Sequence, residues 1–405
     1  DDNDPISPDN IYVITGLSSI EWKEQTQERF PPSIRNRVFH RSDLPVKFAS
    51  EIAKKKNILI IMDEVHIAAK KNQTIKKAFE NAGLLDKQVL YQKDVKILEF
   101  SATPDGTLYD LQKWNDVGAK ICALPGDGYI SSYNLLQQNR VKQYKDLCGY
   151  NRKTGEINKD VFKYIKEIEN NILALKIQNK VQLYHIIRTK NAFEQDITID
   201  NFKKVFNEDG YQFLNYDEKS DITDINEILI KKPLKPTFIF IKEMLRCAKT
   251  MEKKYIGIGY DRYTKNPDDA TVIQSIVGRF SGYDDNGFSI CYTNLTSIHR
   301  YKALWDSNFD RDDLEWNSKT TKFKNGKLEI KPTFNSVHVY AGFETDDSDN
   351  NSDEENRFER GFFAGTEEEV HIETLKIASK CRKLPKPKDK DKDENGCYKI
   401  SGPGC

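Results

Sequence analysis

The chain has no excess charge of either sign, no long apolar run and no closely spaced cysteine pair. Its 63 basic and 63 acidic residues balance, which excludes a uniformly basic coat for nucleic acid but leaves room for a local basic groove. No apolar run approaches the roughly 18–20 residues of a membrane span, so we expect no membrane partner. Seven cysteines without a CxxC pair argue against a disulfide framework and indicate a reducing, cytoplasmic compartment.

The length of 405 residues predicts two or three domains at roughly 150 residues each. Because the chain begins at Asp1 without a methionine and ends at Cys405, we expect it to be a fragment of a longer protein.

Short apolar runs alternate with helical stretches, the pattern of an α/β protein with buried parallel sheets. A first series of predicted strands covers residues 11–15, 58–62, 95–100 and 119–124. A second series covers residues 182–187, 211–215, 237–241, 255–260 and 288–293. Two such series in tandem predict two parallel-sheet domains with a ligand-binding cleft between them.

The composition also suggests boundaries between these parts. We predict a first domain at 1–125, a helical connector at 126–180, a second domain at 181–305, a β-rich appendage at 306–343 and an acidic linker with a flexible tail at 344–405. The appendage contains Asn325-Gly326 between alternating segments, which is a hairpin signal. Residues 344–356 hold seven acids and no base, so we interpret this stretch as a solvated linker. The tail is a candidate site for protein partners.

Two acids, Asp63 and Glu64, follow the most hydrophobic predicted strand, and His66 comes two residues later. Unpaired charges at the end of a buried strand are costly unless they bind something, and ligands bind at the carboxyl ends of strands in open α/β sheets. The first acid can hold Mg²⁺ and the second can orient or deprotonate a water. The alternative is a strand end whose acids only meet solvent or cap a helix.

Ser101, Ala102 and Thr103 directly follow the next predicted strand, and two of them carry hydroxyl groups. These hydroxyl groups could form hydrogen bonds with His66 or its neighbours across adjacent strand ends. Alone, the three residues are more typical of an ordinary strand-to-loop turn that ends at Pro104, but their order after the acids, on successive predicted strands, is more specific.

The DEVH and SAT elements together resemble those of the superfamily 2 (DExH/DEAD-like, ResIII-type) helicases and translocases. The resemblance covers about residues 11–305 and implies two RecA-like domains, with Asp63 on Mg²⁺ and the SAT residues as a coupling motif. It implies nucleic-acid contacts for three residues of motif Ia, namely Thr15, Gly16 and Ser18. In the second domain it implies that Gln274 and Arg279 complete an ATP site. The GRFSGY variant and the richness in Asp, Asn, Lys and Ile resemble proteins of large DNA viruses or phages.

The sequence departs from this family at the phosphate-binding loop. No GxxxxGK[ST] occurs in the 405 residues, although the family places that phosphate-cradling loop before motif Ia. We expect the loop to lie in an upstream segment. The Gln274-to-Arg279 spacing is also one residue longer than usual, and Gly282 stands where a second arginine is expected. Arg279 is then the candidate arginine finger, with a surface arginine as the alternative.

Further residues are candidates for contact with nucleic acid. Several basic residues could meet phosphates, with a solvated surface as the alternative for each; they are His40, Arg41, Arg188, Lys242, Arg246 and Lys249. Trp22, Tyr283 and Tyr301 are candidate base-stacking platforms, with core packing as the alternative.

We therefore predict a nucleic-acid-dependent ATPase that uses ATP and Mg²⁺ and acts as a helicase or translocase, with DNA favoured over RNA. The alternative is an ATPase-deficient, helicase-like module that binds nucleic acid or acts as a scaffold. A third hypothesis is the motor subunit of a restriction or nuclease complex. A viral origin would place the protein in the host cytoplasm or the virion.

Overall fold

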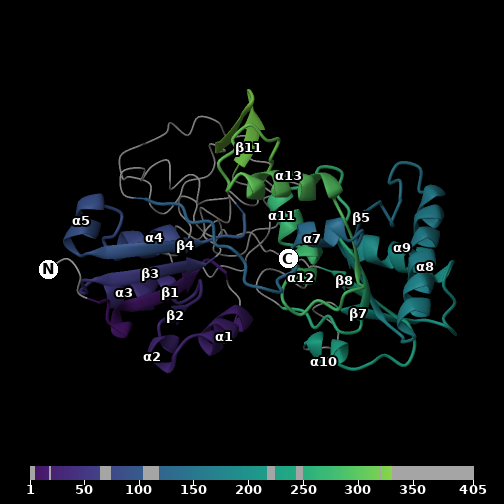
Figure 1. Cartoon of the computed structure of the whole chain (residues 1–405), viewed down its shortest axis with the longest axis horizontal. Coiled ribbons are helices and arrows are strands. Elements are labelled where there is room, and N and C mark those ends of the chain that lie inside the picture. The colour runs from purple at the N-terminus through teal and green to yellow at the C-terminus, as the bar shows by residue number, and fades with distance from the viewer. Residues whose placement is uncertain are drawn as a thin grey trace, which may run out of the picture. The chain divides into compact units, whose positions relative to one another are not determined.

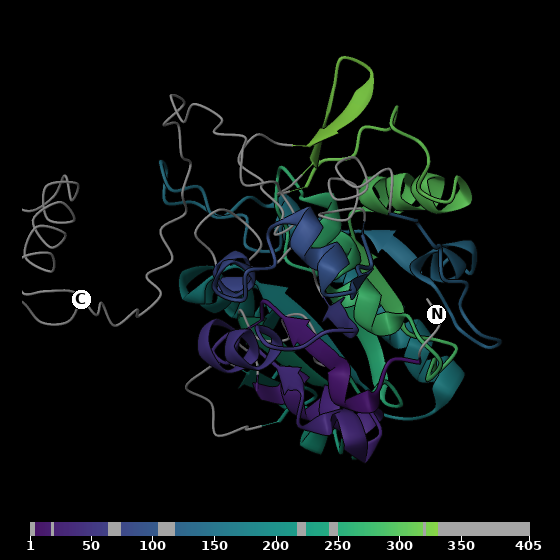
Figure 2. The same ribbon diagram turned by 90° about the vertical axis from the view of Figure 1, so that its left-hand side faces the viewer.

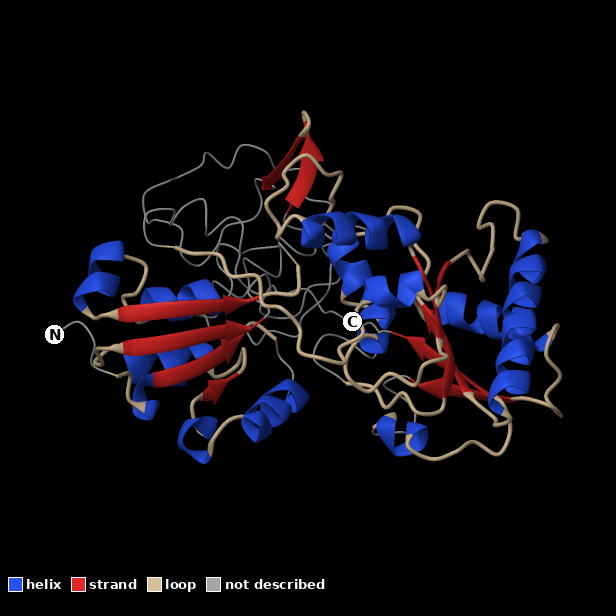
Figure 3. Ribbon diagram, in the orientation of Figure 1, coloured by secondary structure: helices blue, strands red, loops and turns tan. Residues whose placement is uncertain are grey.

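The computed structural model describes residues 5–17, 20–63, 74–103, 118–216, 224–242, 250–318 and 321–330. Within these residues the strands form two parallel sheets and one antiparallel hairpin (Figures 1 and 3). The predicted α/β architecture with two parallel sheets is therefore confirmed. No helix in this part of the chain is both long enough and apolar enough to cross a bilayer.

The first sheet has the strand order β2-β1-β3-β4. Its strands are β1 (Ile11–Thr15), β2 (Val38–Phe39), β3 (Ile58–Asp63) and β4 (Val95–Phe100). The helices of this region are η1 (Pro8–Asn10), α1 (Ile20–Arg29), α2 (Pro32–Arg35), η2 (Leu44–Phe48), α3 (Ala49–Ile52), α4 (Thr74–Asn81) and α5 (Lys87–Gln92).

Successive side chains of β1 point to opposite faces of this sheet, as strand geometry requires. Ile14 belongs to a buried cluster with Phe48 and Phe79, from η2 and α4. Val13 belongs to a second cluster with Trp22 of α1. Helices therefore bury both faces, which explains why β1 and β3 are continuous apolar runs.

The second sheet has the strand order β5-β10-β9-β6-β8-β7, all parallel. Its strands are β5 (Val141–Gln143), β6 (Tyr184–Thr189), β7 (Gln212–Tyr216), β8 (Thr237–Lys242), β9 (Ile256–Tyr260) and β10 (Ile290–Thr293). The helices of this region are α7 (Ser132–Gln137), α8 (Asp160–Asn179), α9 (Ala192–Lys203), α10 (Asn226–Leu229), α11 (Asp269–Ile273), α12 (Ile276–Phe280) and α13 (Leu295–Asp306).

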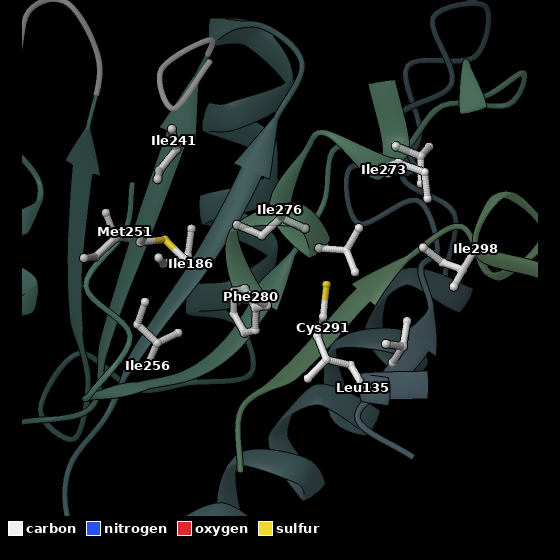
Figure 4. Packing of buried hydrophobic residues seen from close by; sticks show 14 of the residues in the cluster. Leu135, Ile186, Ile241, Met251, Ile256, Ile273, Ile276, Phe280, Cys291 and Ile298 are labelled. Carbon is white, nitrogen blue, oxygen red and sulfur yellow. The ribbon is translucent and has the colours of Figure 1, made fainter. Parts of the chain in front are cut away.

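One core of the second sheet includes Ile186, Ile276 and Phe280 (Figure 4), and the other includes Ile187 on the opposite face. α12 approaches the sheet closely at Gly259 of β9. A Cβ atom on Gly259 would lie 2.5 Å from Cζ of Phe280, so only glycine fits between this strand and this helix.

Three segments differ from the sequence prediction. Residues 119–124, predicted as a strand, form none, and Ile121 and Leu124 are both 82% exposed. A short apolar run becomes a strand only if it pairs and buries a face, and this segment does neither. The sequence also missed β2 and β5, and β5 adds a strand within the predicted helical connector.

The antiparallel hairpin consists of β11 (Thr321–Lys324) and β12 (Lys327–Ile330) (Figure 2, light green). Asn325 and Gly326 both have positive φ, at 52° and 78°, as a two-residue type I′ turn requires. The hairpin predicted at Asn325-Gly326 is therefore confirmed. The acidic linker and tail at 344–405 lie outside the described residues, and the domain boundaries stay predictions.

Candidate functional site

The predicted site residues of the first sheet lie along its carboxyl edge. The pairing register places Thr15 of β1 beside Asp63 of β3, and Asp63 beside Phe100 of β4. Gly16 and Ser101 directly follow two of these strands. Thr15, Asp63 and Ser101, which are far apart in the sequence, are thus brought to one edge. Glu64, His66 and Ser18 lie outside the described residues.

Asp63 accepts a hydrogen bond from Trp22. The indole Nε1 of Trp22 lies 2.7 Å from Oδ2 of Asp63, and Trp22 is only 3% exposed. Trp22 therefore packs in the core, which was the alternative to a base-stacking platform, and it additionally contacts the candidate metal ligand. No sequence pattern pointed to this pair, because the two residues are 41 positions apart.

The SAT residues form a tight turn after β4. The backbone N–H of Thr103 donates to Oγ of Ser101 at 3.3 Å, while Ala102 is exposed. Thr103 is 2% exposed, and its hydroxyl has no hydrogen-bond partner among the described residues. The expected partner His66 lies outside them.

His40 belongs to a cluster of charged side chains around Asp43. Asp43 Oδ2 lies 2.7 Å from His40 Nδ1 and 2.7 Å from Lys23 Nζ, and its Oδ1 lies 2.8 Å from Lys47 Nζ. Burial raises the pKa of Asp43, but hydrogen bonds from Lys23, Lys47 and His40 outweigh it and hold that pKa well below its usual value. His40 therefore forms a hydrogen bond with a buried carboxylate, whereas Arg41 donates to the Thr74 hydroxyl at 3.2 Å.

Ser42, His40 and Asp43 together do not form a catalytic triad. Oγ of Ser42 lies 3.2 Å from Nε2 of His40 and 3.4 Å from its Nδ1. An oxygen in line with the Nε2 lone pair would be much farther from Nδ1 than from Nε2. The hydroxyl therefore lies beside the ring and cannot pass its proton to the histidine as a nucleophile would.

The second sheet gathers a polar cluster at its own carboxyl edge. Arg188, near the end of β6, donates to Asp261 at 2.8 Å and also to the hydroxyl of Ser275. Ser275 donates to the same carboxylate at 2.8 Å, and Asp261 is 4% exposed. Arg188 thus balances a buried acid and ties β6 to the segment between α11 and α12.

A small pocket lies beside this cluster, and its lining includes four cations from three separate segments of the chain: Lys145, Arg188, Lys190 and Arg262. Lys145 and Lys190 are exposed. Only Arg188 was a sequence prediction. Lys190 could have been found from its position just after β6, but nothing in the sequence joins Lys145 and Arg262 to it.

Gln274 and Arg279 lie close together around the start of α12. The guanidinium of Arg279 donates to the backbone carbonyls of Gln274 and Ser275, both at 2.8 Å. Arg279 therefore caps the end of α11, to which Gln274 is the C-cap residue.

Lys242 ends β8 and lies in register with Thr189 of β6, so it shares the carboxyl edge with Arg188. Arg246 and Lys249 lie outside the described residues. Tyr301 packs against Phe309 and Trp316, which is the core alternative, whereas Tyr283 is 60% exposed.

The comparisons with known proteins complete this description. No family model matches the chain. The chain is 27% identical over 337 residues to the uncharacterized protein L594 of Acanthamoeba polyphaga mimivirus, and the aligned region covers 77% of each protein. This match agrees with the viral resemblance predicted above.

Two solved structures are similar in fold. S. cerevisiae Dbp5 bound to RNA and ADP BeF3 matches with a TM-score of 0.41 and 13% identity, over 75% of this chain and 77% of that one. The Escherichia coli DEAH/RHA helicase HrpB matches with a TM-score of 0.43 and 14% identity, over 72% of this chain and 38% of that one. Since both scores lie below 0.5, the description of the fold rests on the two sheets themselves.

Proposed function

We propose that the protein is a nucleic-acid-dependent ATPase that acts as a helicase or translocase. The supporting observation is that the candidate residues of both sheets lie at the carboxyl edges of parallel strands, with Asp63 beside Thr15 on one and Arg188 near Lys242 on the other. Carboxyl edges are the ligand-binding edges of such sheets.

The first sheet would act on the nucleotide. Mg²⁺ takes oxygen ligands and is bound by one or two carboxylates together with substrate phosphates, so the carboxylate of Asp63 at the end of β3 fits this ion. Bound Mg²⁺ would offset charge on the phosphate oxygens. Glu64 would orient the attacking water, and Ser101 with Thr103 would link hydrolysis to nucleic-acid binding. Gln274 and Arg279 would sense the γ-phosphate.

The second sheet would hold the nucleic-acid backbone. Phosphate contacts supply most non-specific affinity and come mainly from Lys and Arg. Asp261 balances Arg188, so the exposed Lys145 and Lys190 are the better phosphate-binding candidates in the pocket. We favour DNA as the polymer, with RNA as the alternative.

A second candidate function is an ATPase-deficient module that only binds nucleic acid. One observation favours it: the guanidinium of Arg279 donates to two backbone carbonyls, which it would have to leave before it could meet a phosphate.

ATP hydrolysis distinguishes the two candidates. We would measure turnover by the chain with single-stranded DNA, duplex DNA or RNA, and use Glu64→Gln as the control. Stimulation by one polymer that is lost in Glu64→Gln supports the ATPase and identifies the polymer. Tight binding of nucleic acid without ATP turnover in the presence of any of the three polymers supports the second candidate instead.

Fluorescence anisotropy tests the nucleic-acid surface separately. Lys145→Ala with Lys190→Ala should weaken binding and reduce the salt dependence by about one unit of slope per lost phosphate contact. The matched control is Lys231→Ala with Lys232→Ala, two exposed lysines on the chain before β8, at the opposite edge of the sheet. Equal effects of the two double variants would contradict the assigned surface.

A further inference from the structure

The hydrogen bond between Trp22 and Asp63 assigns a role to a residue outside the recognised motifs. α1 begins shortly after the end of β1, and Trp22 lies in its first turn. The indole packs in a cluster with Val13 and Ile34. Because the ring is 3% exposed and enclosed by these side chains, its N–H points in one fixed direction.

Asp63 lies where that N–H points. Its neighbour in register is Thr15, the last residue of β1, so its carboxylate lies beside the start of α1. The N···O distance of 2.7 Å is at the short end for N–H···O bonds and typical of a charged acceptor. An indole N–H donates a hydrogen bond and has no lone pair to offer a cation. It can therefore hold the carboxylate without becoming a competing ligand for the cation.

The next residue on α1 makes a second bond to the first sheet region. Lys23 donates to Asp43 at 2.7 Å, and Asp43 also binds His40 and Lys47. Two successive side chains of α1 are thus bonded to two separate parts of the first sheet region. This arrangement restricts rotation of α1 and therefore movement of the Trp22 ring.

We propose that Trp22 is a positioning residue that fixes the orientation in which Asp63 meets a divalent cation. This inference rests on the proposed function, because it takes Asp63 as the metal ligand. Partners that orient a metal ligand typically change metal affinity by 10–100-fold when they are removed.

Trp22→Phe removes the N–H donor and keeps most of the ring packing. The matched control is Trp316→Phe, because Trp316 is also fully buried but its indole N–H has no hydrogen-bond partner among the described residues. Both variants lose one buried indole, and only one of them loses a bond to Asp63.

The test uses the full chain with ¹⁵N-labelled tryptophan and records the indole N–H signals of its four tryptophans by NMR. Trp22→Phe assigns the Trp22 signal. We expect MgCl₂, alone and with ADP, to shift this signal in the wild type and not in Asp63→Asn. Because Trp22→Phe lacks this signal, the Mg²⁺ affinity of every variant is measured by calorimetric titration; it should fall about 10–100-fold in Trp22→Phe and stay unchanged in Trp316→Phe.

The possible failures are distinct. If Asp63→Asn abolishes Mg²⁺ binding but Trp22→Phe binds Mg²⁺ as tightly as the wild type, the role of Trp22 is wrong and the metal assignment stands. If the wild type and Asp63→Asn respond to Mg²⁺ identically, Asp63 is not the ligand, and both the metal assignment and the role of Trp22 are overturned.

Discussion

His185 makes the stability of the second domain depend on pH in a predictable way. The residue lies in β6 and is 1% exposed. Its ring centroid is 5.3 Å from that of Phe238, and a Cβ on Gly257 would lie 2.9 Å from the ring. Nδ1 has no hydrogen-bond partner in the described part of the chain. Burial in these surroundings lowers the pKa of His185 to about 3.

The size of the effect follows from linkage. In the unfolded chain His185 takes a proton near its ordinary pKa of about 6.5, whereas the folded chain excludes that proton until about pH 3. Protonation below pH 6.5 therefore stabilises only the unfolded state, and folding stability falls as pH falls. At pH 5, about 1.5 units below the unfolded pKa, protonation of the unfolded chain lowers the free energy of unfolding by about 2 kcal/mol. At pH 7.5 this loss is close to zero.

Hydrogen exchange of the β6 and β8 amides, corrected for intrinsic rates, gives the opening free energy of this sheet at both pH values. His185→Leu removes the titrating group and keeps an apolar side chain. Between pH 7.5 and pH 5 the wild type should lose about 2 kcal/mol more than this variant. Equal losses in the two proteins would refute the reasoning, whatever the absolute stability of the variant.

Three further predictions concern other buried groups. Asp285→Ala should cost about 3–5 kcal/mol in thermal unfolding, because it strands the guanidinium of Arg140, whose side chain is 8% exposed and lies 2.6 Å from Asp285; a change below 1 kcal/mol would contradict a buried pair. Trp316→Ala should cost about 3–5 kcal/mol, since the ring is fully buried in the core of the second sheet, and a neutral result would remove Trp316 from that core. Asp43, whose pKa is depressed, stabilises the fold above its unfolded pKa, and this stability is lost as pH falls through the folded pKa. Asp43→Asn should therefore have a lower melting temperature than the wild type at neutral pH, and its melting temperature should fall less on acidification. An equal fall in the two proteins would contradict the stabilising role of the Asp43 carboxylate.

The strands of both sheets could largely be predicted because a buried parallel strand is an apolar, β-branched run, as in β3 and β8. β2 and β5 were missed since two or three residues are too short to show a period. Residues 119–124 were predicted wrongly because an apolar run does not reveal whether a neighbouring strand exists to pair with it.

Some residues of the candidate site could likewise be predicted from the sequence, and others could not. Asp63 and Ser101 could be predicted because strand ends in a parallel sheet meet at one edge. The sequence could not predict the bond from Trp22 to Asp63 or the shared pocket of Lys145 and Lys190, because only tertiary folding brings these residues together. Arg279 was predicted from its motif, but its bonds to two backbone carbonyls depend on local geometry that no motif contains.

The close approach of α12 to β9 at Gly259 has a practical consequence. α12 carries Arg279, and the glycine leaves no free space between the strand and the ring of Phe280. A single methyl group at position 259 would act as a wedge under the helix and would tilt or lift Arg279 without altering its side chain. Gly259→Ala would thus displace Arg279 by moving α12 and leave the arginine itself unchanged. The resulting loss of activity would measure how strongly function depends on the position of this helix.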